Sequence, residues 1–136
     1  MQLRLINNPD KSRAILYKIA RVVYAETHAT TLRLVEAMAS MIANIAHVTG
    51  RDYSDIISDS ELFNSLDSKS ENNKLLFVNA SDNKFQMCLR VVSRMLHGTL
   101  PDSCNGATRF HHADKMPSWS TSRGYIADID GLLFYL

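Results

Sequence analysis

The sequence predicts one α+β domain over residues 1–136, mainly helical, with a small antiparallel sheet near the C-terminus. Two observations lead to this fold class. Three segments before Gly98 carry apolar residues at helical spacing, and the chain after Pro101 changes to short alternating segments around a turn. At 136 residues the chain is long enough to bury a single core without disulfides or a metal.

The first helix is predicted from its start signals and its apolar spacing. Asp10 and Ser12 both favour a helix N-terminus, and the helical pattern continues to about Thr27. Polar Lys18 and Arg21 interrupt one apolar stripe, which consists of Ile15, Leu16, Ile19, Val22 and Val23. One face of this helix is therefore expected to join the core.

The second helix is predicted from Thr31 to Val48. Thr30 or Thr31 would cap it, and Gly50 would end it because glycine readily adopts the left-handed conformation. It is apolar almost all round, which indicates a central, buried helix. Its polar residues fall on one narrow line, made of Arg33, Glu36, Ser40, Asn44 and His47. That line is either a solvent-facing strip or the floor of a cleft.

A polar segment from Arg51 to about Ser81 predicts a long loop, with short helical turns near Ile56–Ile57 and Leu62–Leu66. A loop of this length in a compact domain is usually functional or mobile.

A third helix is predicted after Ser81 or Asp82, and it ends at Gly98. Cys88 falls on its apolar face, which indicates a packed core thiol. Two cysteines are a weak disulfide framework at this chain length, so we expect Cys88 and Cys104 to be free thiols.

The end of the chain predicts the sheet. Thr108–His111 alternates in polarity, and short strands are expected at Tyr125–Ile129 and at Leu132–Tyr135. Asp130 and Gly131 between the last two segments are residues typical of a tight hairpin turn.

Composition and motifs exclude several functional classes. A formal net charge of +1 without a basic run gives no basis for binding nucleic acid or an anionic membrane surface. No segment is long and apolar enough to span a bilayer. The histidines are dispersed, and strand alternation turns His111 and His112 to opposite faces, so no metal site is expected. No phosphate loop or nucleophile elbow is present, and no cofactor is expected.

The start of the chain, residues 1–10, lacks the apolar segment of a secretory signal. We therefore expect synthesis in the cytoplasm, with action elsewhere only after release or export by another route.

One carboxylate interrupts the pattern of the first helix. The stripe through Ile15, Ile19 and Val22 continues to Glu26, about three turns after Ile15 and on the same side. Glu26 also lies in the last turn, where unpaired carbonyls disfavour a negative charge. Burial and the helix end both raise the pKa of a carboxyl, which makes Glu26 a candidate general acid. The alternative is a helix that ends by Tyr24, with Glu26 in solvent.

Four segments in order along the chain carry a family resemblance. The first helix ends in Ala20–Glu26 (Ala-Arg-Val-Val-Tyr-Ala-Glu), and Asn44 stands near the end of the second helix. Gly106–His112 (Gly-Ala-Thr-Arg-Phe-His-His) is followed by Met116–Trp119 (Met-Pro-Ser-Trp), and Gly131–Tyr135 ends in Phe-Tyr. Together these segments resemble the SleB-type cell-wall hydrolases, a family that includes the spore cortex-lytic enzymes.

The resemblance implies a lysozyme-like fold and cleavage of the glycan strands of peptidoglycan. It implies that Glu26 is the single catalytic acid of a lytic transglycosylase. Such an acid protonates the glycosidic oxygen and then, as base, helps the muramyl 6-hydroxyl to close an anhydro ring. The residues expected to bind the substrate are Tyr24, Asn44, Thr108, Phe110, His111 and Trp119. Ordinary packing or backbone hydrogen bonding is the alternative role for each of them.

Departures from the family pattern leave a second function open. The family usually follows its acid with Ala-Arg-Gly-Glu, whereas Thr27–Thr30 here lacks the second acid, and Ile45 replaces the arginine that commonly follows Asn44. Simple hydrolysis would need a second carboxylate, for which the candidates are Asp114, Asp128 and Asp130. The alternative function is an inactive relative that binds peptidoglycan or serves as a structural part of a phage-like or wall-spanning assembly. A third possibility is an unrelated α+β domain with no groove at Glu26.

Overall fold

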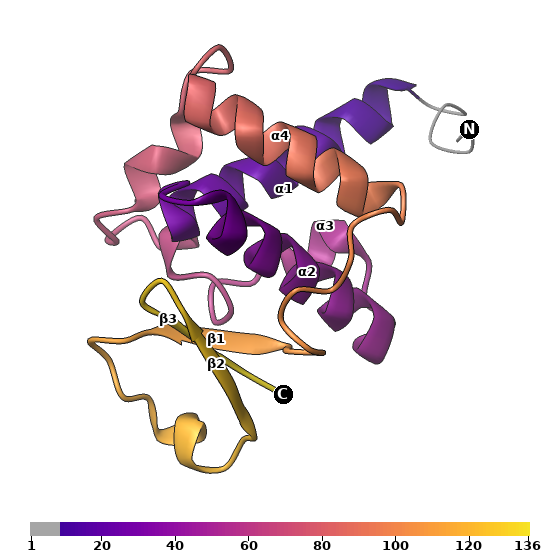
Figure 1. The fold of residues 1–136 in the computed structure, drawn as a ribbon. Helices are drawn as coiled ribbons and strands as arrows, with labels where there is room; N and C mark the ends of the chain where they lie inside the picture. The colour runs from indigo at the N-terminus through magenta and orange to yellow at the C-terminus, as the bar shows by residue number, and fades with distance from the viewer. Residues whose placement is uncertain (1–8) are drawn as a thin grey trace.

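The computed structural model describes the backbone of residues 9–136 and the side chains of residues 13–136. The prediction about a secretory signal rests largely on residues 1–8, which lie outside the described residues. A group of helices forms one layer, and a small sheet lies beneath it (Figure 1). No helix in the described part of the chain has both the length and the apolarity needed to cross a membrane.

The three long helices are α1 (Pro9–Thr27), α2 (Leu32–Thr49) and α4 (Asn83–Leu96), which confirms the three predicted helices. Helix α1 begins one residue before Asp10, the first of its two predicted start residues. It packs against both α2 and α4.

The predicted ends of α2 and α4 are confirmed by their hydrogen bonds. The Thr31 hydroxyl accepts from the Leu34 N–H, and the Asp82 carboxylate accepts from the Phe85 N–H. These bonds satisfy backbone donors that a helix leaves unpaired in its first turn. Gly50 ends α2 in the left-handed conformation at φ 73°, where a side chain would be strained.

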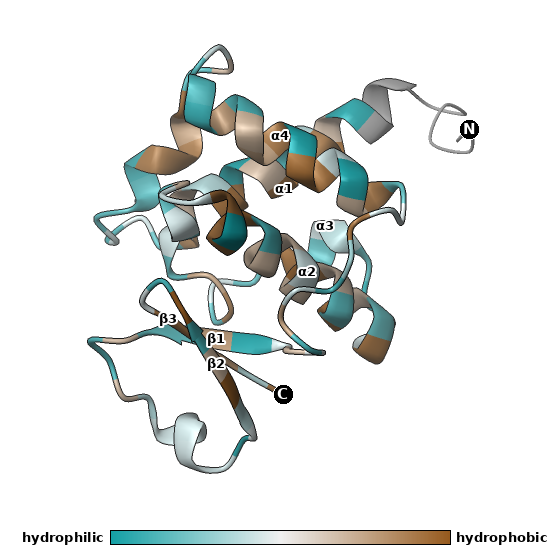
Figure 2. Cartoon of the chain, viewed as in Figure 1, coloured by the Kyte–Doolittle hydropathy of each residue, from teal (hydrophilic) through white to brown (hydrophobic). Residues whose placement is uncertain are grey.

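The core lies where the three long helices meet. Helix α2 is at its centre, as predicted from its apolar composition, and α4 alternates between hydrophobic and hydrophilic residues as an amphipathic helix does (Figure 2). Cys88 and Cys104 are both buried free thiols, as expected. The largest fully buried apolar side chains are Ile19, Leu34, Met38, Met41, Ile42, Ile56, Phe63, Phe85 and Phe134.

The segment between α2 and α4 contains α3 (Tyr53–Ile56), η2 (Asn64–Leu66) and η3 (Asn73–Phe77). The first two match the predicted short turns, whereas η3 was not predicted. Arg21 of α1 fixes this last turn, because its guanidinium donates to the carbonyl oxygens of residues 76 and 78 at 3.1 and 2.6 Å. The long loop is therefore held against α1.

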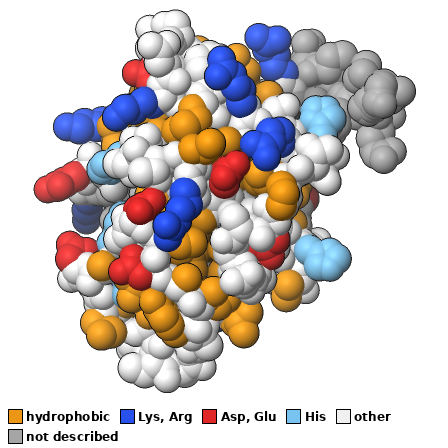
Figure 3. Space-filling model, viewed as in Figure 1, with side chains coloured by type: hydrophobic (Ala, Val, Ile, Leu, Met, Phe, Trp, Pro, Cys, Tyr) orange, Lys and Arg blue, Asp and Glu red, His pale blue; other side chains and the backbone are white. Residues whose placement is uncertain are grey.

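The sheet consists of β1 (Arg109–His112), β2 (Tyr125–Ile129) and β3 (Leu132–Tyr135), in the antiparallel order β1-β3-β2. The predicted hairpin turn is confirmed: Asp130 and Gly131 have φ of 51° and 91°, the left-handed region that such turns require. The short turn η4 (Ser118–Thr121) lies in the connection from β1 to β2. Figure 3 shows the molecule from the same side as Figure 1, and hydrophobic side chains gather there over the region of the sheet.

The polar line on α2 does not form a continuous solvent-facing strip or the floor of a cleft, because the segment before β1 covers the middle of the line. The Ser40 hydroxyl donates to the Pro101 carbonyl oxygen at 3.3 Å, and the Asn44 side-chain amide donates to the Ala107 carbonyl oxygen at 3.1 Å. Arg33 and His47, at the two ends of the line, are exposed. The middle of the line thus serves to hold residues 101–107 in place.

Candidate active site

Glu26 is buried, as its place in the helical stripe predicts. It lies in the last turn of α1 and is only 1% exposed. Its Oε2 accepts a hydrogen bond of 2.8 Å from the backbone N–H of Ser65 in η2, while its Oε1 has no hydrogen-bond partner. The helix does not end at Tyr24, so the solvent-exposed alternative is wrong.

Strand β1 brings a second side chain to this carboxylate. His112 Nε2 lies 3.9 Å from Glu26 Oε1. Phe110, two residues earlier and therefore on the same side of the strand, lies edge-on to the His112 ring with centroids 6.0 Å apart. Its ring also packs against Phe63 and Phe134, at centroid distances of 6.3 and 6.1 Å. Packing of this apolar cluster holds β1 against β3 and against the residue that precedes η2.

A cleft of about 550 Å³ opens at Glu26. One wall comes from the segment between α3 and η2 together with the first residue of η2, and the other comes from β1 and the connection that follows it. The lining residues are Glu26, Ser60, Glu61, Leu62, Asn64, Arg109, Phe110, His111, His112, Lys115, Met116, Pro117 and Trp119. A volume of this size is in the range of ligand-binding clefts.

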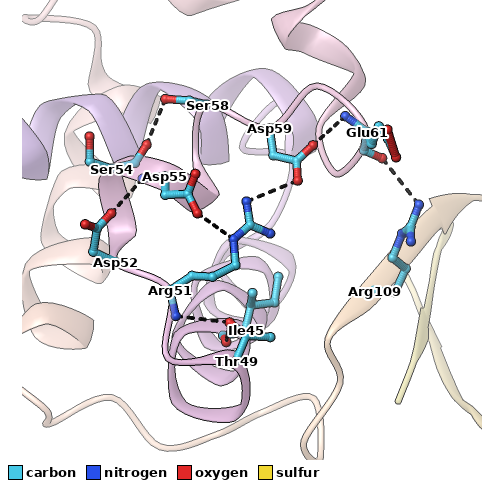
Figure 4. Close-up of polar contacts among 10 residues, drawn as sticks. All are labelled: Ile45, Thr49, Arg51, Asp52, Ser54, Asp55, Ser58, Asp59, Glu61 and Arg109. Carbon is cyan, nitrogen blue, oxygen red and sulfur yellow. Dashed lines mark hydrogen bonds and ion pairs between the residues drawn. The ribbon is translucent and has the colours of Figure 1, made fainter.

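A chain of polar contacts fixes the first wall (Figure 4). The Arg51 guanidinium donates to Asp55 at 2.7 Å and to Asp59 at 3.2 Å, and Asp59 in turn accepts from the Glu61 N–H at 2.9 Å. The Arg51 hydrogen bond and charge hold the pKa of the Asp55 carboxyl below its usual range. Arg109 of β1 donates to the Glu61 carbonyl oxygen at 3.4 Å, which connects the two walls.

The outer face of the sheet carries an aromatic group beside the cleft. Trp119 lies edge-on to both His111 and Tyr135, with ring centroids 5.6 and 5.2 Å apart, and the guanidinium of Arg109 lies 4.6 Å from the Trp119 ring centre. A hydrogen bond of 2.9 Å joins His111 Nε2 to the Tyr135 hydroxyl. Burial lowers the pKa of Arg109, and the nearby charge of Arg123 lowers it further.

The structure brings four of the predicted site residues to one cleft: Glu26, Phe110, His111 and Trp119. The other three do not line it. Tyr24 packs edge-on against Phe85, and burial raises the pKa of its hydroxyl. Asn44 donates to the 101–107 segment, and the Thr108 hydroxyl accepts from Arg123 at 2.9 Å.

His112 was not predicted as a site residue, although its Nε2 lies 3.9 Å from Glu26 Oε1. Its signal in the sequence is its spacing of two from Phe110, which places both on one face of a strand. Glu61 also lines the cleft, whereas the three candidate second carboxylates do not: Asp114, Asp128 and Asp130 are absent from the lining. Asp130 instead accepts a hydrogen bond of 2.6 Å from Thr31, which anchors the hairpin turn to α2.

Among the residues that the structure describes, no group of three or more histidine, cysteine, aspartate or glutamate side chains lies close enough to hold a metal ion.

No family model and no curated protein matches this chain. The chain is similar to a solved structure, the catalytic domain of the germination-specific lytic transglycosylase SleB from Bacillus anthracis. The two chains are 18% identical, and the match covers 90% of this chain and 93% of that one, with a TM-score of 0.71. The chain therefore has the lysozyme-like fold of the SleB catalytic domain, which confirms the resemblance in its sequence at the level of the fold.

Proposed function

We propose that this chain cleaves the glycan strands of peptidoglycan by lytic transglycosylation, with Glu26 as its single general acid and base. The observation that carries the proposal is the state of Glu26: it is buried, it lines the cleft, and one of its two carboxyl oxygens has no partner. The fold shared with a lytic transglycosylase catalytic domain supports the same activity.

The reaction needs one carboxyl group that gives and then regains a proton. Glu26 Oε1 donates its proton to the glycosidic oxygen, and the bond between that oxygen and C1 of the muramyl sugar breaks with its electron pair on the leaving oxygen. The carboxylate then accepts the proton of the muramyl 6-hydroxyl, whose oxygen forms the new bond to C1. Glu26 ends protonated, and no water is consumed.

The Ser65 N–H restricts this chemistry to one oxygen. Because its hydrogen bond of 2.8 Å occupies Glu26 Oε2, the partner-free Oε1 is the oxygen available to the substrate. A carboxyl fixed in this way is already oriented before the substrate arrives, which removes part of the entropic cost of reaching the transition state.

Trp119 is proposed to bind a sugar ring of the strand. Its side chain lines the cleft and is held by contacts with Arg109 and Tyr135. An aromatic ring that is rigidly held and partly exposed offers an apolar face on which a pyranose can pack.

The test is release of soluble glycan fragments from purified sacculi. Wild-type protein should release fragments, Glu26→Gln should release none while remaining folded, and Glu71→Gln should behave as wild type because Glu71 is exposed and lies outside the cleft. Full activity in the Glu26→Gln variant would overturn the proposed role of Glu26. Sacculus binding by the wild type without any release would favour the inactive, peptidoglycan-binding alternative.

A further inference from the structure

We infer that His112 is a positioning residue for Glu26, whose Nε2–H donates a hydrogen bond to Oε1 once that oxygen has given up its proton. The inference rests on the proposed function and adds a second residue to the same site.

Unpartnered buried polar atoms carry the inference. Within residues 13–136, three buried side-chain atoms have no hydrogen-bond partner: Glu26 Oε1, Ser65 Oγ and His112 Nε2. All three belong to one site, since the backbone N–H of Ser65 donates to the other oxygen of Glu26 and His112 Nε2 lies 3.9 Å from Oε1. Burying a polar atom without a partner is costly, so such a concentration at one carboxyl calls for a functional explanation.

The directions of these groups favour contact between Oε1 and Nε2. The Ser65 N–H holds Oε2, which limits rotation of the carboxyl and leaves Oε1 as the oxygen nearer to His112. The His112 ring is held by its edge-on contact with Phe110, at an interplanar angle of 65°. Its side chain is 35% exposed overall although Nε2 itself is buried, so the ring extends from the carboxyl towards the open cleft. A shift of about 1 Å would bring the two atoms to hydrogen-bond distance.

Other charged groups line the cleft, but none of them is placed as His112 is to donate a hydrogen bond to Glu26 Oε1. Glu61, Arg109 and Lys115 line the same cleft, as does His111, whose Nε2 is already bonded to the Tyr135 hydroxyl. Among the basic side chains that the structure describes, His112 alone comes within 4.0 Å of the Glu26 carboxyl.

The proposed step moves no proton from His112. Glu26 passes its proton to the glycosidic oxygen, and the negative charge that forms on the carboxylate is stabilised by the neutral Nε2–H of His112. The bond weakens again when the carboxylate accepts the proton of the 6-hydroxyl. A donor aimed at a charge that exists only after the first transfer lowers the barrier without tightening substrate binding.

The test uses three substitutions that differ in where they place an N–H group. Glutamine puts its amide nitrogen near the position of the imidazole Nε2, asparagine reaches only the position of Nδ1, and alanine has neither. We expect His112→Ala and His112→Asn to lower kcat about 10- to 100-fold with little change in KM, and His112→Gln to stay within about 5-fold of wild type. His47→Ala is the control, because His47 is exposed on α2 and lies outside the cleft.

Thermal unfolding of each variant separates folding from function. If His112→Ala unfolds, the comparison of His112→Gln with His112→Asn decides, because both retain a polar side chain. An active wild type with fully active His112→Ala, or with His112→Asn as active as His112→Gln, would overturn this inference and leave the proposed function intact. An inactive wild type would overturn both.

Discussion

Replacing Glu26 with glutamine should stabilise the folded protein while it abolishes the proposed activity. The side chain is 1% exposed, and no lysine or arginine among the described residues lies within ion-pair distance of it. A buried carboxyl with one unpartnered oxygen is costly when ionised, whereas an amide of the same shape carries no net charge. The amide oxygen can still accept from the Ser65 N–H. The amide N–H can donate to Nε2 of His112 once the gap of 3.9 Å closes and the imidazole takes its Nδ1–H tautomer, in which Nε2 is an acceptor.

The magnitude follows from the unpaired oxygen. One buried polar atom without a partner costs about 1–3 kcal/mol, and the new amide contact recovers only part of it, so we expect a gain of about 1–2 kcal/mol in the free energy of unfolding. In a domain of 136 residues this gain raises the melting temperature by roughly 3–8 °C.

Urea unfolding followed by circular dichroism at neutral pH measures the difference directly. Glu71→Gln is the matched control, since a change at an exposed glutamate should alter the free energy of unfolding by less than about 0.5 kcal/mol. A Glu26→Gln variant that is no more stable than wild type would refute the view that this carboxyl is held in the fold at a cost to stability.

Three further predictions concern other parts of the structure. Burial raises the pKa of the Cys88 and Cys104 thiols to about 12. Iodoacetamide at about pH 8 should therefore label neither thiol in the folded protein and both thiols in urea. Rapid labelling of the folded protein, measured by intact mass, would contradict their burial. Burial opposes ionisation of Asp102, but hydrogen bonds from the Cys104 and Gly106 N–H groups hold its pKa below the usual range. Its stabilising contribution is present above about pH 4 and is lost as pH falls further, so thermal melts should show the advantage of wild type over Asp102→Asn shrinking between about pH 6 and pH 3. Trp119→Ala should raise KM for solubilised glycan strands about 10-fold with kcat nearly unchanged, and an unchanged KM would exclude Trp119 from substrate binding.

Local sequence signals predicted the parts of this fold that local chemistry determines. The helix caps at Thr31 and Asp82, the left-handed end at Gly50 and the hairpin turn at Asp130 all depend on residues adjacent in sequence. The burial of Glu26 was predictable for the same reason, because a helix fixes the direction of a side chain from its spacing alone.

The rest depends on contacts between distant segments. The turn η3 is held by Arg21, more than fifty residues away, and the α2 side chain of Asn44 is covered by a segment that follows α4. The same limit applies to the site: strand alternation places Phe110 and His112 on one face, but nothing local shows that this face meets the end of α1. Tyr24 and Asn44 belong to the resemblance, and the structure places both outside the cleft.

The mass of the released fragments tests the central claim most directly. Lytic transglycosylation by Glu26 leaves an anhydromuramyl end, so muropeptides released from purified sacculi by wild-type protein should each be lighter by one water than the products of hydrolysis. The Glu26→Gln variant should yield neither product. Fragments that carry ordinary reducing ends would contradict the one-carboxylate reaction, and no release by the wild type would contradict the proposal that this chain is an enzyme.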